Sequence, residues 1–560
     1  MIEIKDKDIR SRAFLFPKRI VWSQGQVEHS EVLILEREHQ ISLSAHEPCV
    51  MRSTQGNKAS ILLDYGTEIH GGVRILVWES TTKSAKLRVR FGESVSEAMS
   101  ELGGDTNATN DHARRDMIVE VGMMSMNPIG ESGFRFVRID LEEPDTTITL
   151  KSICAVLIYK DVPYRGSFQC NDELLNRIWE TGAYTVHLNM QEYIWDGIKR
   201  DRLVWVGDMH PEVTAIQAVF GEDDSVEKSL DFIRKETPLP GWMNHMASYS
   251  MWYVIIVYDW FLYTGKKAFI EKQKDYLAGI LHQLSVHIDE NGKDTVTEGR
   301  FLDWPSVGKD NVVDAGVQAL HILATKSLKN IFSILGDETR VEQCENDLQK
   351  LCHFAQKELD YETSKQAAAL LVLAGQKDAK ETNERLLKQG GAKGMSTFMG
   401  YYILSARGMA GDYEGCLACI REYWGGMLEL GATTFWEDFD VEWMKNASRI
   451  DELLEEGKVD VHATYGGHCY QGYRHSFCHG WAAGVTPWLS EYVLGVQILE
   501  PGCKVVTIEP HLGDLEWVKG SYPTPYGDII ISHKKRNDGT VETTLQAPKE
   551  IECRTSNSYF

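Results

Sequence analysis

The pattern of apolar residues changes twice along this chain, and these changes constrain its fold more than any single motif. Short runs that alternate apolar and polar residues, such as Ser60–Asp64 and Val73–Glu79, dominate the region before Pro163 and are typical of strands. Helical spacing of apolar residues then continues for more than 300 residues. Strand-like runs return after Gly495. Because a chain of 560 residues is too long for one hydrophobic core, we expect several domains.

We predict three domains: a β-sandwich over residues 1–162, a helical domain over 163–495 and a small β-domain over 496–560. The helical domain is expected to begin with an N-cap at Asn171–Asp172 and to end with a helix over Trp481–Leu494. About a dozen helices joined by long, aromatic-rich loops fit an α/α toroid, in which inner helices surround a cleft. A helical solenoid would need a fixed repeat period, and the sequence shows none.

The charge balance disfavours two classes of partner. The chain has 59 basic and 82 acidic residues and a net charge of −23, which argues against nucleic acid and against anionic membranes. We find no continuous apolar h-region at the N-terminus and no run long enough to span a bilayer, so we expect a cytoplasmic protein. The eleven cysteines suggest a reducing compartment and free, mostly buried thiols.

One segment, residues 195–208 (WDGIKRDRLVWVGD), concentrates the chemistry. It places three carboxylates, three cations and two indoles within fourteen residues, and apolar side chains lie between the charged ones. Carboxylates beside flat apolar rings suit carbohydrate chemistry, because the rings stack on sugar C–H faces while the acids bind hydroxyl groups or move protons. A salt-bridged loop is the alternative interpretation of this segment.

The chain resembles the bacterial α-L-rhamnosidases of glycoside hydrolase family 78 in four blocks that occur in the family's order. They are Gly166–Trp179 (GSFQCNDELLNRIW), Arg200–Asp208 (RDRLVWVGD), Gly431–Glu437 (GATTFWE) and Ser476–His479 (SFCH) with the following Ala483–Gly484 and Trp488–Leu489. The resemblance covers nearly the whole chain. It implies a central (α/α)6 toroid, the six-hairpin glycosidase fold, flanked by an N-terminal β-sandwich and a small C-terminal β-domain.

The resemblance also implies an inverting mechanism, in which one carboxylic acid protonates the glycosidic oxygen and a second carboxylate activates water. Asp201 stands at the position of the general acid, where many relatives carry Glu, and Glu437 stands at the position of the general base. Because 236 residues separate them in the sequence, only the toroid could bring them together. The expected activity is the release of terminal α-L-rhamnose from rhamnosides or short oligosaccharides.

Several further residues match family positions that bind the sugar. Asp196 and Asp208 match acids that bind hydroxyl groups, and we expect both to stay ionised and to raise the pKa of Asp201. The stretch from Asp196 to Asp201 is one residue shorter than the commonest family pattern, so the match at Asp196 is the less secure one. The other expected substrate-binding residues are Arg200, Trp205, Trp252, Asp303, Trp304, Trp436 and His479.

Alternatives remain at the site and for the function. The run WEDFDVEW is rich in acids, so Asp438, Asp440 or Glu442 could be the base in place of Glu437. The chain could also be an inverting hydrolase for another terminal sugar, or a catalytically silent sugar-binding protein. We expect a small carbohydrate as the partner and a homodimer as the default assembly, and we identify neither a cofactor nor a metal-ligand cluster.

Overall fold

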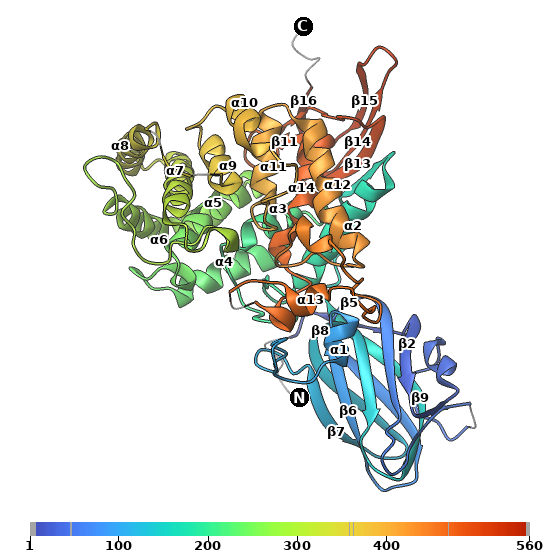
Figure 1. Cartoon of the computed structure of the whole chain (residues 1–560). Helices are drawn as coiled ribbons and strands as arrows, with labels where there is room; N and C mark the ends of the chain where they lie inside the picture. Colours follow the sequence, from blue (N-terminus) through green and yellow to red (C-terminus); the bar gives the residue numbers. More distant parts are fainter. Residues whose placement is uncertain (1–6, 45–46, 358, 362, 469, 556–560) are drawn as a thin grey trace, which may run out of the picture.

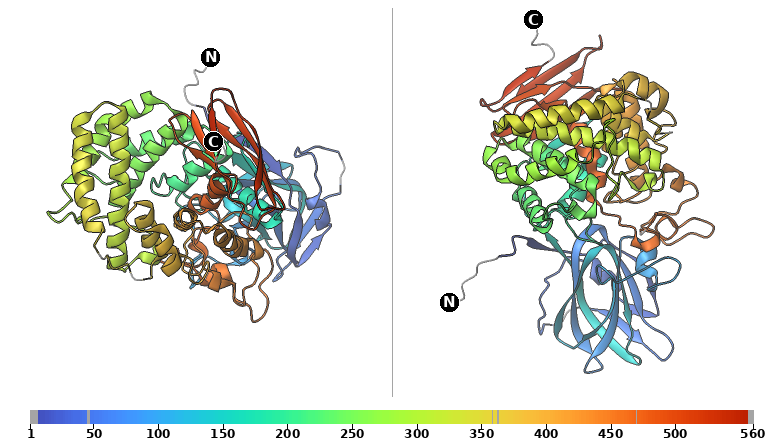
Figure 2. Two further views of the ribbon diagram at one scale, coloured as in Figure 1. Left: turned by 90° about the horizontal axis from the view of Figure 1, so that it is seen from above. Right: turned by 90° about the vertical axis from the view of Figure 1, so that its left-hand side faces the viewer.

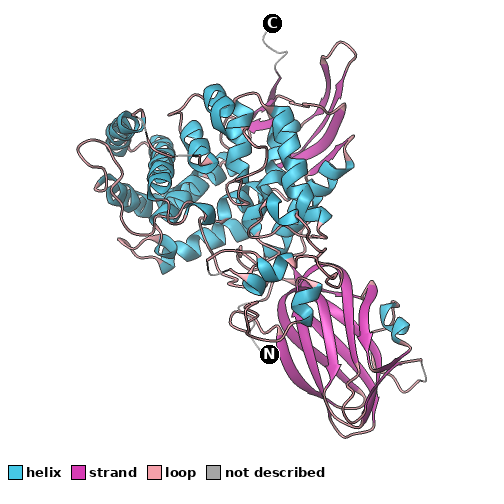
Figure 3. Ribbon diagram, viewed as in Figure 1, coloured by secondary structure: helices cyan, strands magenta, loops and turns pink. Residues whose placement is uncertain are grey.

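The structure, a computed structural model, describes residues 7–44, 47–357, 359–361, 363–468 and 470–555. The ends of the first and third predicted domains, residues 1–6 and 556–560, therefore lie outside the described residues. A strand-rich region, a large helical region and a second, smaller strand-rich region follow one another along the chain (Figures 1 and 3). This order confirms the predicted sequence of β, α and β regions.

The N-terminal region is an antiparallel sheet whose hydrogen bonds connect nine strands in the order β3-β4-β9-β5-β8-β6-β7, with β1 on β9 and β2 on β5. These strands are β1 (Ser11–Leu15), β2 (Arg19–Gln24), β3 (Gln26–Glu28), β4 (Cys49–Ser53), β5 (Ser60–Ser80), β6 (Ala85–Gly92), β7 (Asp116–Val121), β8 (Ser125–Leu141) and β9 (Thr146–Tyr159). The short helices η1 (Ser30–Ile34) and α1 (Val95–Met99) interrupt them.

The strands predicted over Ser60–Asp64 and Val73–Glu79 are two parts of the single long strand β5. Its pairing with β8 shifts register between Asp64 and Ile69 and again between Gly71 and Val73. Such bulges bend a strand and let it follow a curved sheet.

Six helices of the central region contact one another in a closed series, each touching the next and the last touching the first. They are α3 (Met209–Val219), α5 (Ala247–Thr264), α7 (Asp310–Ile334), α9 (Lys365–Leu373), α11 (Gly400–Met409) and α14 (Val485–Trp488). The other helices of eight or more residues lie outside this ring (Figure 2); they are α2 (Glu173–Asn189), α4 (Asp224–Glu236), α6 (Lys267–Ser285), α8 (Glu338–Ala355) and α12 (Tyr413–Glu429).

Burial separates the inner helices from the outer ones. Every residue of α3 is buried, whereas α4 buries one face and exposes charged residues on the other. The predicted N-cap is confirmed, because the Asp172 carboxylate accepts hydrogen bonds from the backbone N–H groups of Leu174 and Leu175. Polar residues on the buried inner helices must therefore find partners inside the ring.

The prediction of one regular helix over Trp481–Leu494 is wrong. The segment consists of a 3-10 turn, η7 (Gly480–Gly484), the short α14 and a π turn, η8 (Leu489–Val493). Pro487 lacks the N–H that a regular α-helix would donate to the carbonyl of residue 483, so the helical hydrogen-bond pattern cannot run through this position. The remaining short helices are η2 (Met243–His245), η3 (Trp304–Ser306), α10 (Ala379–Thr382), η4 (Asn383–Leu387), η5 (Val441–Met444), α13 (Val461–Thr464) and η6 (Gly472–Arg474).

Two small sheets complete the C-terminal region. The first contains β10 (Ser167–Cys170), β13 (Trp517–Thr524), β14 (Gly527–Lys535) and β15 (Val541–Gln546), and the second contains β11 (Val496–Ile498), β12 (Val505–Ile508) and β16 (Glu552–Thr555). Strand β10 precedes the helical region in sequence but pairs antiparallel with β13. The C-terminal sheet thus ties together both ends of the helical region. Among the described residues, no helix is both long enough and apolar enough to cross a membrane.

Candidate active site

The segment 195–208 forms an irregular connection between α2 and α3, and its backbone turns sharply at its centre. Asp201 and Arg202 adopt left-handed backbone conformations, with φ of 54° and 55°. Such conformations are uncommon for residues other than glycine and cluster at functional sites. A bridge between Gly197 and His479 places the segment beside residues 475–479, far away in the sequence.

The Arg200 guanidinium joins the two predicted catalytic carboxylates. Its Nη1 donates to Asp201 Oδ1 at 3.2 Å, and its Nη2 donates to Glu437 Oε2 at the same distance. Arg200 is buried, and its guanidinium carbon lies 3.8 Å from the centre of the Tyr470 ring. The structure therefore brings Asp201 and Glu437 to one cation, although 236 residues separate them in the chain.

Glu437 is held firmly in the interior of the ring. Its backbone N–H donates to the Ser476 carbonyl at 2.9 Å, and its own carbonyl accepts a hydrogen bond from Trp481 Nε1 at 2.8 Å. Burial raises the pKa of the Glu437 carboxyl to about 7, while the Arg200 charge opposes this rise. A carboxylate with a pKa near neutrality suits a general base.

His479 lies between three carboxyl groups. Its Nε2 is 3.9 Å from Asp196 Oδ2, 3.9 Å from Asp208 Oδ2 and 4.0 Å from Glu437 Oε1. The Tyr249 hydroxyl donates to Asp208 Oδ1 at 2.5 Å, and Gly207 leaves room for this ring, because a Cβ there would lie 2.3 Å from it. These contacts define a compact polar cluster next to the Asp201–Glu437 pair.

The expectation that Asp196 and Asp208 stay ionised is opposed by their burial in the ligand-free protein. Burial raises the pKa of both carboxyls well above the usual range of aspartate. The negative charge of Asp201 is a further cause of the rise at both residues. Burial also lowers the pKa of His479 well below its usual range, with a smaller contribution from the Arg200 charge, so the imidazole is neutral.

Asp201 is the more accessible of the two predicted catalytic acids. Trp205 Nε1 donates to its Oδ2 at 3.2 Å, so the predicted aromatic wall of the site touches the predicted acid directly. On the other side, Nδ1 of His112, a residue of the N-terminal region, lies 3.2 Å from Asp201 Oδ1. The acid is thus held between the ring and the N-terminal region.

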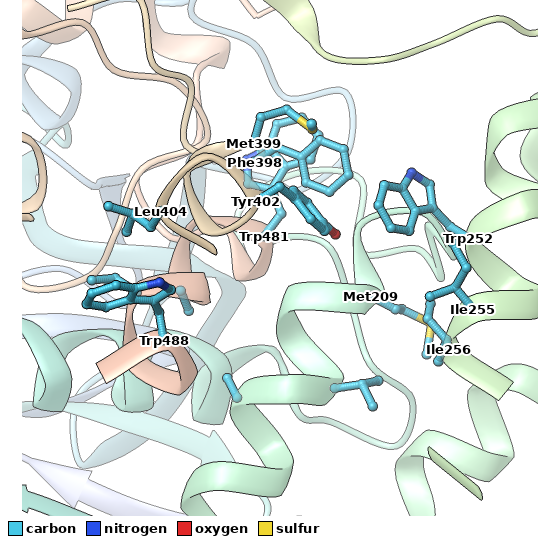
Figure 4. Close-up of a cluster of buried hydrophobic side chains, with 14 of the residues drawn as sticks. Met209, Trp252, Ile255, Ile256, Phe398, Met399, Tyr402, Leu404, Trp481 and Trp488 are labelled. Atoms are coloured by element: carbon cyan, nitrogen blue, oxygen red, sulfur yellow. The ribbon is translucent and has the colours of Figure 1, made fainter. Parts of the chain in front are cut away.

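Four predicted substrate-binding residues have different surroundings. Trp252 packs in the interior of the ring against Tyr402 and Phe398 (Figure 4), and Trp436 stacks on Phe477 with 4.1 Å between ring centres. Both indoles are thus buried against other aromatic rings, and their role in substrate binding stays a prediction.

The Asp303 carboxylate caps η3: it accepts from the backbone N–H of Ser306 and, at 2.7 Å, from the Ser396 hydroxyl. Trp304 stacks with His468 and makes an edge contact with Tyr470, whose ring covers Arg200. Of these four residues, Trp304 approaches Arg200 through Tyr470, and Trp436 directly precedes Glu437 in the chain.

The alternative bases are placed less favourably than Glu437. Glu442 is exposed and pairs with Lys445. Asp438 is largely buried, and burial raises its pKa to about 6. Its carboxylate accepts a hydrogen bond from the backbone N–H of the adjacent Phe439, and within the described residues its contacts do not include Arg200. Asp440 caps η5 by accepting from the Glu442 N–H.

Sequence reasoning did not identify three residues that contact or neighbour this cluster: Glu212, Tyr249 and His112. Glu212 follows Asp208 by four residues, a spacing that places both on one helix face and that could have indicated it. It is fully buried, and its carboxyl oxygens have no hydrogen-bond partner in the described part of the chain. Burial raises its pKa well above the usual range of glutamate. Neither Tyr249 nor His112 carries a sequence signal.

One group of potential metal ligands lies beside the site. Glu93, Glu97 and His462 bring their ligand atoms within 4.8 Å of one another, where α1 and α13 meet (Figure 1). The Lys199 ammonium already lies among them, 2.8 Å from Glu93 Oε2 and 2.7 Å from the His475 carbonyl oxygen. An internal cation thus pairs with both acids and holds residue 199, next to Arg200, against the N-terminal region.

Comparison with known families identifies the chain. The model of the bacterial α-L-rhamnosidase six-hairpin glycosidase domain matches residues 163–493, and the model of the bacterial α-L-rhamnosidase C-terminal domain matches residues 495–556. The first match alone covers more than half of the chain. The chain therefore belongs to the bacterial α-L-rhamnosidase family, family 78 of the glycoside hydrolases.

The relatives are distant in sequence. An α-L-rhamnosidase from Alteromonas sp. (strain LOR) is 23% identical over 533 residues, which cover 87% of this chain and 54% of the relative. The chain thus spans about half the length of this curated relative.

Two solved structures share the fold. The family 78 rhamnosidase of Bacillus sp. GL1 has a TM-score of 0.75 at 21% identity, covering 94% of this chain and 55% of that one. A rhamnosidase from Klebsiella oxytoca with rhamnose bound has a TM-score of 0.66 at 18% identity, covering 86% of this chain and 96% of that one.

Proposed function

We propose that this protein is an inverting exo-acting α-L-rhamnosidase, in which Asp201 protonates the glycosidic oxygen and Glu437 activates the attacking water. Membership of the α-L-rhamnosidase family supports the substrate class. The observation that carries the assignment of roles is the single buried Arg200 guanidinium that contacts both carboxylates.

The arrangement is compatible with inversion. Two contacts of 3.2 Å to the two terminal nitrogens of one planar guanidinium keep Asp201 Oδ1 and Glu437 Oε2 within about 9 Å of each other, and inverting pairs lie roughly 6.5–9.5 Å apart. The asymmetry of the surroundings supports the division of roles. Glu437 is buried beside the neutral His479, whereas Asp201 faces the side on which the leaving group can reach solvent.

Asp196, Asp208 and His479 are proposed to bind the hydroxyl groups of a terminal rhamnose. Neutral aspartic acids can donate as well as accept hydrogen bonds, which suits a ring of sugar hydroxyls. The Klebsiella relative, whose structure holds rhamnose, supports a small sugar as the ligand. Trp205 is proposed as the apolar wall, because its indole lies directly beside Asp201.

The fold of the chain supports the proposed active site. We propose that the closed series of six inner helices is an (α/α)6 toroid, that the N-terminal sheet folds into two layers as a sandwich, and that the domains span 1–162, 163–495 and 496–560. The contact pattern of the inner helices and the ranges of the two family matches support this division.

The test is hydrolysis of a panel of aryl α- and β-glycosides that includes 4-nitrophenyl α-L-rhamnoside, with the anomer of the released sugar followed by NMR. We expect β-L-rhamnose from the α-L-rhamnoside alone. Release of α-L-rhamnose would contradict inversion, and turnover of another glycoside would favour a hydrolase for another terminal sugar. Saturable binding of rhamnose without hydrolysis of any aryl glycoside or rhamnosyl disaccharide would favour a silent binding protein.

A further inference from the structure

The N-terminal region reaches Asp201 through residues 100–115, which connect α1 to β7 and which we call the connecting segment. His112 in this segment makes two contacts with the active-site turn. Its Nδ1 lies 3.2 Å from Asp201 Oδ1, and its backbone carbonyl accepts a hydrogen bond from Arg202 Nη2 at 3.0 Å. Asp201 and Arg202 are the two consecutive residues with left-handed backbone, so His112 contacts the strained turn through both of them.

The connecting segment is attached to the helical region at two points shortly before His112. Before it, the Thr106 carbonyl accepts from the backbone N–H of Tyr473 at 2.8 Å. Next to it, Asp111 pairs with Arg474, and the carbonyl of Arg474 accepts from Arg200 Nε at 2.9 Å. The imidazole is therefore fixed against the site by contacts that do not depend on its own side chain.

Exposure places His112 between solvent and the acid. The His112 side chain is 35% exposed, whereas the Asp201 side chain is 9% exposed. The leaving group of a glycoside must extend away from the acid that protonates its oxygen. His112 thus lies on the solvent side of Asp201, the side toward which a leaving group can extend.

We propose that His112 is a positioning residue that orients the Asp201 carboxyl for protonation of the leaving group, so that the N-terminal region completes the active site. This inference rests on the proposed function. The 3.2 Å approach of Nδ1 to Oδ1 needs only a small rotation to become an aligned hydrogen bond, and catalytic hydrogen bonds often tighten when substrate binds. His112 acts through Asp201 and needs no contact with the sugar.

The test compares His112→Ala and His112→Asn on two rhamnosides that differ in leaving group. Methyl α-L-rhamnoside needs protonation of a poor leaving group, and 2,4-dinitrophenyl α-L-rhamnoside scarcely does. We expect His112→Ala to lower kcat/KM about 10- to 100-fold for the methyl rhamnoside and less than about threefold for the dinitrophenyl rhamnoside. His112→Asn should restore most of the loss, because its amide nitrogen can donate from nearly the position of Nδ1.

Arg114→Ala provides the matched control, since Arg114 is an exposed residue of the same segment and should change neither rate. An equal loss on both substrates would mean that His112 only supports packing, and no loss on the methyl rhamnoside would also overturn the proposal. These outcomes leave the proposed function intact, because the wild-type protein hydrolyses the rhamnosides in both cases.

A crystal structure of His112→Ala tests the inference without relying on activity, and so separates it from the proposed function. We expect the Asp201 carboxyl to rotate away from its wild-type position while the Glu437 carboxyl stays in place. An Asp201 side chain that keeps its wild-type conformation would overturn the positioning role, even if the protein hydrolysed no rhamnoside at all.

Discussion

The two proposed catalytic carboxylates share Arg200 but stand in contrasting surroundings. Glu437 is buried, its backbone is anchored to Ser476 and Trp481, and its pKa is set by burial against one cation. Asp201 lies on a left-handed turn, keeps partial exposure and contacts the N-terminal region through His112. The helical ring thus fixes the proposed base by packing and electrostatics. The proposed acid is fixed by the conformation of a loop and by the N-terminal region.

Removal of the base should have the largest effect. Glu437→Gln keeps the shape of the side chain but cannot accept a proton from water, so we expect kcat for 4-nitrophenyl α-L-rhamnoside to fall roughly 10²- to 10⁴-fold. The matched control is Glu442→Gln, which changes an exposed acid in the same run and should leave kcat unchanged. A large loss in the control instead would transfer the role of base to Glu442.

Removal of the acid should depend on the substrate. Asp201→Asn should lower kcat/KM roughly 10²- to 10⁴-fold for methyl α-L-rhamnoside, but much less for the 2,4-dinitrophenyl rhamnoside, whose leaving group departs without protonation. Glu437→Gln should slow both substrates similarly, because each still needs an activated water. Steady-state kinetics of the four combinations distinguish the two roles, and equal losses in Asp201→Asn would contradict the assignment of the acid.

Arg200 links the two halves of the comparison, and its removal should shift a pH profile. The base works only when ionised, so kcat/KM of the wild-type protein should fall as the pH drops below about 7, the pKa of Glu437. Arg200 lowers this pKa, hence Arg200→Met should move the acidic limb to higher pH. We also expect a loss of about 10- to 100-fold at the optimum, because hydrogen bonds to charged groups contribute about 1.5–3 kcal/mol. An acidic limb that stays in place would show that another group controls it.

The smallest catalytic effect is expected at Glu212, behind the buried side of the site. The pKa of the Glu212 carboxyl is higher in the folded protein than in the unfolded chain. Its contribution to the free energy of unfolding is therefore complete at pH values below the pKa of the unfolded chain. This contribution declines as the pH rises toward the pKa in the folded protein. Glu212→Gln removes this titrating group and should reduce the loss of unfolding free energy by at most about 1.4 kcal/mol per pH unit above the pKa of the unfolded chain.

Denaturant unfolding of wild type and Glu212→Gln at several pH values measures the difference in the pH dependence of the unfolding free energy. The kcat for 4-nitrophenyl α-L-rhamnoside is measured on the same two proteins. Identical slopes would mean that Glu212 is ionised in the folded protein. The close packing of Glu212 against Gly480, where a Cβ would lie 1.5 Å from its Oε1, makes the conservative Gln the suitable replacement.

The sequence by itself determined the order of β, helical and β regions, because apolar periodicity is a local property that the structure retains. It also marked the segment 195–208, since acids beside indoles are visible as a motif, whereas Glu437 was predicted from the family resemblance. The sequence could not decide which of its aromatic candidates face the site. Trp252 and Trp436 have the composition of sugar platforms but pack in the interior, because their neighbours come from distant segments.

Only the tertiary structure decided which groups surround the carboxyls of the site. Burial raises the pKa of Asp196 and Asp208, against the expectation from sequence, because desolvation depends on what surrounds a carboxyl in space. The contact of His112 with Asp201 joins residues 89 positions apart in two regions, and no local pattern marks it. Apolar periodicity depends only on residues that are close in the sequence. Electrostatic effects and contacts between domains arise only when the folded chain brings distant residues together.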